Sequence, residues 1–206
     1  MQAMAYEKCI EVNREFWGEL AGLAPGEVTG RTGATFANGL YHLPFLDREL
    51  LVNPQAARIE IAGAPETDPG FRVCLTALLY LLRLDIGALG PPISPLELPG
   101  GATFFRGHHG LPHAALEERF GGDLAGFTAA GDRLHGISRP AGDAAVVLEV
   151  FPGLRVEVIL WLRDEEFPAQ ASFTLPTHLD RFWNLDAVWG LLHLAAQEML
   201  IAGSPA

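Results

Sequence analysis

The stretch from Gly87 to Pro112 restricts the folding of this chain more than any other part of the sequence. It contains five of the 15 prolines and six of the 23 glycines found in 206 residues. Proline removes a backbone donor and fixes φ, while glycine makes a regular element entropically costly, so no long helix or strand is expected to run through this stretch. A compact domain seldom carries so long a connection without a use for it or an internal structure of its own. We therefore predict a functional loop here, between regions of regular structure.

The second half of this connection, Leu98 to His113, presents polar side chains on a backbone rich in glycine and proline. It holds three of the seven histidines and one arginine, Arg106. Arg106 follows the aromatic pair Phe104 and Phe105, and a guanidinium beside aromatic rings commonly holds a carboxylate or phosphate. The alternative is a buried aromatic anchor with a solvated arginine, and histidines that only bond to backbone groups of the loop. The sequence leaves both interpretations open.

The acidic run Asp164 to Glu166 is the second polar segment, because it follows an apolar strand and precedes Phe167 and Pro168. Strand ends that border loops are places where binding sites gather. A carboxylate turned inward against an arginine or histidine would have a pKa suited to acid–base chemistry. The alternative is a solvated turn, in which all three carboxylates have the pKa usual for exposed acids. If the two segments meet in space, they form one ligand-binding surface. Its predicted members are Arg106, His108, His109, Asp164 and Glu165.

A metal centre is an alternative use of the same side chains. His109 and His113 have the four-residue spacing that places two imidazoles on one helix face, although Gly110 and Pro112 oppose a helix between them. No serine or threonine stands with a histidine in a recognisable nucleophile pattern, so covalent catalysis is not expected. The predicted metal ligands are His108, His109 and His113, and the general base of such a metal-dependent enzyme would be Glu165 or Glu166.

Hydrophobic spacing and turn residues predict helices and strands in separate parts of the chain. The expected helices are Met4–Leu23, ended by Pro25-Gly26, then Pro69–Leu84, His113–Phe120, Asp123–Leu134 with Asp123 as its cap, and a last helix capped by Asn184 and stopped by Gly203. The expected strands are two or three short ones between Thr29 and Ile61, broken at Asn38-Gly39 and Asn53-Pro54, then the hairpin of Ala144–Phe151 and Leu154–Leu162, and Gln170–Leu175. This segregation predicts an α+β fold, with an antiparallel sheet covered by helices. No repeat or linker argues against a single domain over residues 1–206.

Composition excludes several classes of partner. The 25 acidic and 14 basic residues give a net charge of −11, which disfavours nucleic acid and anionic membrane surfaces. One pair of cysteines, Cys9 and Cys74, is no disulfide framework in a chain of this size. We expect both on apolar helix faces, which favours a reducing setting. The start of the chain lacks a basic region followed by an apolar run, and no apolar stretch is long enough to span a membrane. We therefore expect a cytoplasmic protein without signal peptide or membrane span.

Several short strings are more specific than ordinary turn chemistry. They are Leu98–Gly101, Phe105–His108, Leu111-Pro112, Phe120-Gly121, Gly142-Asp143 and Leu160–Ala169, the last reading Leu-Trp-x-x-Asp-Glu-Glu-Phe-Pro-Ala. From about Pro69 to the C-terminus, they resemble the bacterial and archaeal domain-of-unknown-function family 3786 (DUF3786). The resemblance implies an anaerobe-type cytoplasmic protein, and some similar proteins are joined to iron–sulfur modules associated with corrinoid methyl transfer. Two cysteines cannot hold a four-cysteine cluster, so an iron–sulfur or corrinoid group would belong to a protein partner.

Three functions are consistent with these residues. The leading hypothesis is an accessory protein, not an enzyme, that binds a small anionic ligand, a cofactor or a protein partner through the loop and the acidic turn. The second is the metal-dependent enzyme. The third is a structural or assembly subunit, such as a homodimer, in which Trp183, Trp189 and the last helix contact another chain.

Overall fold

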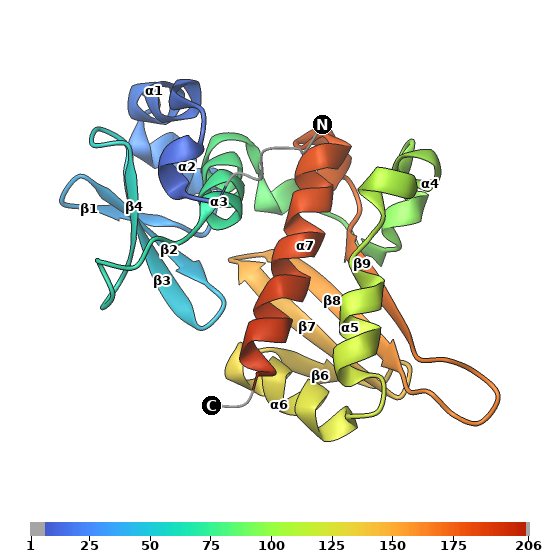
Figure 1. The fold of residues 1–206 in the computed structure, drawn as a ribbon. Coiled ribbons are helices and arrows are strands. Elements are labelled where there is room, and N and C mark those ends of the chain that lie inside the picture. Colours follow the sequence, from blue (N-terminus) through green and yellow to red (C-terminus); the bar gives the residue numbers. More distant parts are fainter. Residues whose placement is uncertain (1–6, 205–206) are drawn as a thin grey trace. The chain divides into compact units, whose positions relative to one another are not determined.

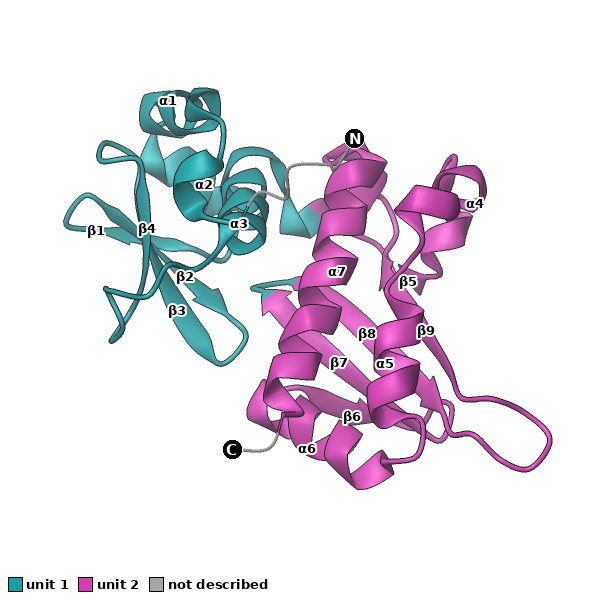
Figure 2. Ribbon diagram, in the orientation of Figure 1, with its two compact units in different colours: residues 1–87, 151–153 teal, residues 88–150, 154–206 magenta. Residues whose placement is uncertain are grey.

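The computed structural model describes residues 7–204, which form an α+β fold with two antiparallel sheets, as predicted (Figure 1). The chain divides into two compact units (Figure 2). The first comprises residues 1–87 and 151–153, and the second comprises residues 88–150 and 154–206. This division does not test the prediction that residues 1–206 fold cooperatively as a single domain, which stays a prediction.

The first unit combines a four-stranded sheet with three helices. Its helices are α1 (Arg14–Gly22), α2 (Pro25–Arg31) and α3 (Phe71–Arg83), preceded by the 3₁₀ turn η1 (Cys9–Glu11). The strands lie in the order β1 (Thr35–Ala37), β2 (Leu40–Phe45), β3 (Arg48–Asn53) and β4 (Arg58–Ile61). The predicted turn at Asn38-Gly39 is confirmed, because both residues have positive φ, at 53° and 80°, as a two-residue hairpin turn requires.

The start of this unit differs from the predicted helix Met4–Leu23, of which residues 4–6 lie outside the described part. The helix is broken at Val12, and Asn13 caps α1 by accepting a hydrogen bond from the Glu15 N–H at 3.0 Å. Pro25 does not end this helix but begins the next one, because proline's fixed φ and missing donor suit the first turn of a helix. The predicted central helix Pro69–Leu84 is confirmed as α3, in which eight residues are buried.

The hydroxyl of Tyr80, on α3, joins distant parts of this core. It accepts a hydrogen bond from the Gly33 N–H at 2.9 Å and donates one to the Pro152 carbonyl at 2.8 Å. The ring of Phe151 lies 5.0 Å from the Tyr80 ring and 5.5 Å from the Phe45 ring. A Cβ on Gly33 would lie 2.2 Å from the Pro152 side chain, so this close approach requires glycine. The turn 151–153 is thereby an integral part of the first unit.

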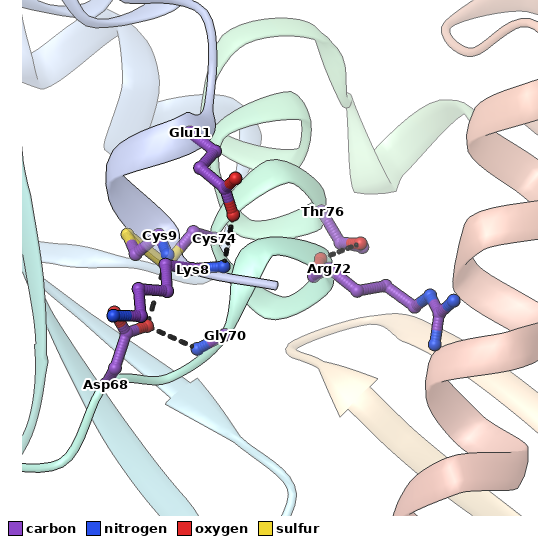
Figure 3. The surroundings of a disulfide bond; sticks show 8 residues. All are labelled: Lys8, Cys9, Glu11, Asp68, Gly70, Arg72, Cys74 and Thr76. Atoms are coloured by element: carbon purple, nitrogen blue, oxygen red, sulfur yellow. Dashed lines mark hydrogen bonds between the residues drawn. A yellow bond between two sulfur atoms is a disulfide. The ribbon is translucent and has the colours of Figure 1, made fainter. Parts of the chain in front are cut away.

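The expectation about the two cysteines is wrong. Cys9 and Cys74 form a disulfide that joins η1 to α3, with Cα atoms 5.4 Å apart (Figure 3). Cys9 lies in a single 3₁₀ turn and not on a helix face, and this turn brings its side chain to α3. Disulfides are rare in reducing compartments, so the cysteines no longer argue for a reducing setting.

The second unit packs four helices with a five-stranded antiparallel sheet. Its strands lie in the order β5 (Pro92–Ile93), β9 (Gln170–Pro176), β8 (Leu154–Trp161), β7 (Ala144–Phe151, of which Phe151 belongs to the first unit) and β6 (Ile137–Arg139). The helices are α4 (Gly101–Phe104), α5 (His113–Phe120), α6 (Leu124–Arg133) and α7 (Leu185–Ala202). The predicted hairpin, the third strand and the helix His113–Phe120 are confirmed. Val156, Val158 and Leu160 of β8 are fully buried on the face that the helices cover.

Both predicted N-caps in this unit are present. The Asp123 carboxylate accepts from the Gly126 N–H, and the Asn184 side chain accepts from the Ala187 N–H. At the other end of α7, Arg119 donates to the Gly203 carbonyl and Arg133 to the Ala202 carbonyl. Cations at a helix C-terminus complement both the unpaired carbonyls and the helix dipole.

Helix α7 is, by length and composition, the one described helix that would suffice to cross a membrane. Eight of its residues are buried in the second unit. A buried core helix of a globular domain passes the same test of length and composition, so this feature is weak support for a membrane span.

The connection Gly87–Pro112 has an internal structure of its own, which is one of the two explanations expected for so long a connection. It contains the 3₁₀ turns η2 (Ile86–Ala88), η3 (Pro95–Glu97) and η4 (Gly107–His109), besides β5 and α4. Each element is only two to four residues long, as expected where proline and glycine interrupt every longer run. The segment is therefore a chain of short turns that can follow the surface of the helices.

We expect Tyr80→Phe to lower the free energy of unfolding by about 1–2 kcal/mol, because it leaves the half-buried N–H of Gly33 and the half-buried carbonyl of Pro152 without their partner. Urea denaturation followed by circular dichroism measures this loss. Tyr41→Phe is the matched control, since its ring is equally buried but its hydroxyl forms no hydrogen bond within residues 7–204. An equal loss in both variants would contradict the role of the Tyr80 hydroxyl.

Candidate functional site

The candidate site lies where the loop after α4 meets α7, within the second unit. Tight packing shapes α4 before this loop, because a Cβ on Gly101, its first residue, would lie 2.2 Å from the Pro95 carbonyl oxygen. Gly107 then takes a positive φ of 58° and begins η4. Glycine is the residue that adopts such a conformation without strain. Arg106 and His108 are consequently presented on an exposed turn.

The carbonyl of Gly110 fastens this loop to α7. It accepts a hydrogen bond from Nε1 of Trp189 at 3.1 Å, and it lies 3.3 Å from Nε2 of His193. A carbonyl oxygen only accepts, so the second bond requires the His193 tautomer that carries its proton on Nε2. Two side chains one turn apart on a long helix therefore hold one point of the loop.

Four rings form a continuous row beside this point, and we call Phe104, His109, Trp189 and His193 the aromatic row. His109 stacks on Phe104, with ring centres 4.3 Å apart and planes at 28°. Trp189 meets His109 edge to face at 6.2 Å and lies 4.1 Å from His193. Nε2 of His109 also lies 3.6 Å from the Asp186 carboxylate. The His109 side chain is still 45% exposed, so its ring is held in place without being buried.

His113 is placed differently from the other two loop histidines. It begins α5, and its ring stacks on Phe173 at 5.3 Å. Burial lowers the pKa of His113, with the nearby Glu117 opposing this effect. His113 is therefore a neutral packing residue of the second unit at neutral pH.

The acidic turn lies elsewhere in this unit. The Arg163 N–H donates to the carbonyl of Gly121, which caps the C-terminus of α5, whereas the histidine loop enters the N-terminus of the same helix. An eight-residue helix is about 12 Å long. Figure 1 shows α4 and the β8–β9 loop at opposite ends of α5. The structure thus brings Arg106, His108 and His109 together but leaves Asp164 and Glu165 apart from them.

Within the turn, the Asp164 carboxylate accepts hydrogen bonds from the backbone N–H groups of Phe167 and Glu166, at 2.7 and 2.8 Å. These two bonds lower the pKa of Asp164. Glu165 and Glu166 are exposed. Asp143, at the same end of the sheet, accepts from the Leu162 N–H at 2.8 Å. Both aspartates therefore have backbone partners, and that is the usual role of aspartate in turns.

The predicted metal site finds no support in the geometry. Across residues 7–204, no three side chains of histidine, cysteine, aspartate or glutamate converge as metal ligands. His109 is engaged with Phe104, and His113 with Phe173, so the three predicted ligands do not share a centre.

Sequence reasoning missed the contribution of α7. Asp186, Trp189 and His193 are spaced by three and four residues, which places them on one helix face. They interrupt an otherwise apolar helix, and this was a readable signal for a polar stripe. Trp189 was interpreted instead as a core or oligomer contact. Which loop this stripe contacts depends on the tertiary fold, so the local pattern could not show it.

A family model, Domain of unknown function (DUF3786), matches residues 24–198. The chain belongs to this family. The DUF3786 match begins well before Pro69, so it also includes most of the first unit, which the resemblance had left out. No curated protein and no solved structure shows significant similarity to this DUF3786 chain.

We expect His113→Phe to reduce the loss of stability in acid. A lowered pKa means that the unfolded chain binds the proton more readily, so stability is complete above the unfolded pKa of about 6.5 and is lost as pH falls below it. Phenylalanine keeps a ring against Phe173 but does not titrate. Urea denaturation at pH 7.5 and pH 5 tests this, and identical pH dependence in both proteins would refute it.

We expect Trp189→Phe to loosen the loop while leaving the fold intact. The variant keeps a ring in the aromatic row but loses a hydrogen bond worth about 1 kcal/mol, which corresponds to roughly fivefold faster local opening. Hydrogen exchange of the His109 and Gly110 amides measures this opening. Trp161→Phe is the control, because Trp161 is 40% exposed on β8, at the other end of the unit. Unchanged exchange at His109 and Gly110 would show that the Trp189 bond does not hold the loop.

Proposed function

We propose that the second unit is a binding module that recognises a small anion, bearing a carboxylate or phosphate group, through Arg106, His108 and His109. The observation that carries this proposal is the double fastening of Gly110 to α7, which fixes the loop backbone beside His109, whose ring is itself held by Phe104 and Trp189. A binding site whose side chains are already ordered loses less conformational entropy when its ligand arrives. The proposal keeps the accessory role predicted from the sequence. It reduces the predicted binding surface to Arg106, His108 and His109.

Local charge supports an anionic ligand. The chain carries a net charge of −11, yet residues 98–113 contain one arginine, three histidines and no carboxylate. Arg106 and His108 are exposed on one turn, and His109 follows on its edge. Arginine offers paired donors that match a carboxylate or phosphate, and imidazole adds a further donor. Asp186 is the opposing group, because it already lies 3.6 Å from His109.

The aromatic row supports binding and not turnover. Phe104 covers one face of His109, and Trp189 meets its edge, so the imidazole is held as a donor of defined direction. A hydrolytic or transfer enzyme would need a nucleophile beside a base, and the row contains none. Asp164 and Glu165 remain predicted binding residues, but for a separate surface at the acidic turn. Three further expectations also stay predictions: that the protein forms a homodimer, that its partner is an iron–sulfur or corrinoid protein, and that it is cytoplasmic.

The test is titration of the isotope-labelled protein with inorganic phosphate and, separately, with acetate, followed by amide and indole chemical shifts. We expect saturable shifts at Gly107 to Gly110 and at the Trp189 indole N–H. Arg106→Ala should weaken binding about tenfold or more, since a hydrogen bond to a charged group contributes about 1.5–3 kcal/mol. A response to only one of the two anions identifies the group that is recognised.

The matched control is Arg139→Ala, which removes another exposed arginine, on the edge strand β6. It should bind both anions as the unchanged protein does. Equal affinity in Arg106→Ala and the unchanged protein would overturn the assignment, as would shifts spread evenly over the surface.

A further inference from the structure

The segment Glu7–Val12, at the start of the described chain, is joined to α3 and to the loop before it (Figure 3). The disulfide links Cys9 to Cys74 of α3 across 65 residues of sequence. The Cys9 N–H donates to the carboxylate of Asp68, which precedes α3, at 3.1 Å, and the Phe71 N–H donates to the Glu7 carbonyl at 2.9 Å. The disulfide is the covalent link among these attachments.

The other polar contacts of this segment are internal. The Glu11 carboxylate accepts from the backbone N–H groups of Glu7 and Lys8, at 2.7 and 2.6 Å. These bonds would survive if the segment left α3. Of residues 7–12, Cys9 and Val12 are buried while the other four are exposed, and Ile10 is 82% exposed. The burial of Cys9 and Val12 is therefore the apolar contact that would hold the segment once the disulfide is opened.

The family match adds an independent observation. It covers residues 24–198, so Cys74 lies within the family region and Cys9 lies before it. The disulfide consequently joins the family's core to a segment that is outside the matched region.

We propose that Cys9–Cys74 is a reversible redox clasp, which holds the segment 7–12 on α3 when oxidised and releases it when reduced by a dithiol. A thiolate of the reductant attacks Sγ of Cys9, which is 8% exposed, whereas Cys74 is fully buried in α3. Cys74 leaves as a thiolate and takes up a proton. The second thiol of the reductant then displaces Cys9, so two electrons and two protons pass to the pair and the reductant becomes a disulfide.

Release has a defined structural consequence. Ile10 and Val12 line a surface groove of about 530 Å³, together with Trp17 and residues 54–57. Departure of the segment would remove this part of the lining, whereas we expect α1 to stay on the unit because Trp17 and Leu20 are buried. The clasp therefore changes the lining of this groove without any need to unfold the unit.

Lys8 provides a specific test, because it is the one lysine of the chain and immediately precedes Cys9. A lysine-specific protease therefore cuts after residue 8 and nowhere else, and the loss of the first eight residues is read by mass spectrometry. We expect cleavage to be about tenfold faster or more in dithiothreitol than in the oxidised protein, since cleavage follows the population of the open segment. Removal of the reductant and reoxidation should restore the slow rate.

The control is the double variant Cys9→Ser with Cys74→Ser, which should be cut as fast as the reduced protein and should not respond to dithiothreitol. Circular dichroism of the reduced protein should retain the native spectrum. Equal cleavage rates with and without reductant would overturn the proposal. Two freely alkylated thiols in the untreated protein would overturn it as well, and so would global unfolding on reduction, which would make the bond a staple of the whole unit.

Discussion

The Gly110 carbonyl is the contact on which the candidate site depends. The preceding backbone is rich in glycine and proline, and such a chain has no ladder of hydrogen bonds to fix its course. Trp189 and His193 supply the missing anchor from a long, well-packed helix. Because both donors converge on one acceptor, the loop is fixed to α7 at the Gly110 carbonyl. The exposed imidazole of His109 is positioned by this arrangement and not by burial.

Each unit is built around a helix whose neighbouring polar groups are satisfied from distant parts of the chain. In the first unit, the Tyr80 hydroxyl pairs a loop N–H with a hairpin carbonyl. In the second, Arg119 and Arg133 close the end of α7. Buried polar groups are costly unless they are paired, so such contacts select one packing among many of similar apolar content. The candidate loop is attached to the face of α7 through Gly110.

Local signals allowed much of the fold to be predicted. Asp123 and Asn184 were recognisable as caps, and Pro152-Gly153 as the turn of a hairpin, because each acts on its own neighbours within three residues. The Cys9–Cys74 bond was missed, since no local pattern reports on partners 65 residues apart. The sequence left open whether Arg106 and Asp164 meet, because that depends on which end of α5 each loop adjoins. Pro25 was predicted to end a helix but begins α2. Proline is compatible with both the end of one helix and the start of the next, so the sequence alone did not distinguish these positions.

The five-stranded sheet has long strands at its centre and very short ones at its edges. β7 and β8 have eight residues each, whereas β5 has two, beginning with Pro92, and β6 has three, ending with Arg139. Proline offers no N–H to an incoming strand, and a charged side chain on an edge discourages stacking of further chains. The sheet is therefore a poor template for aggregation, even at concentrations where molecules collide often. Its most hydrophobic strands are protected by neighbours too short to recruit another chain.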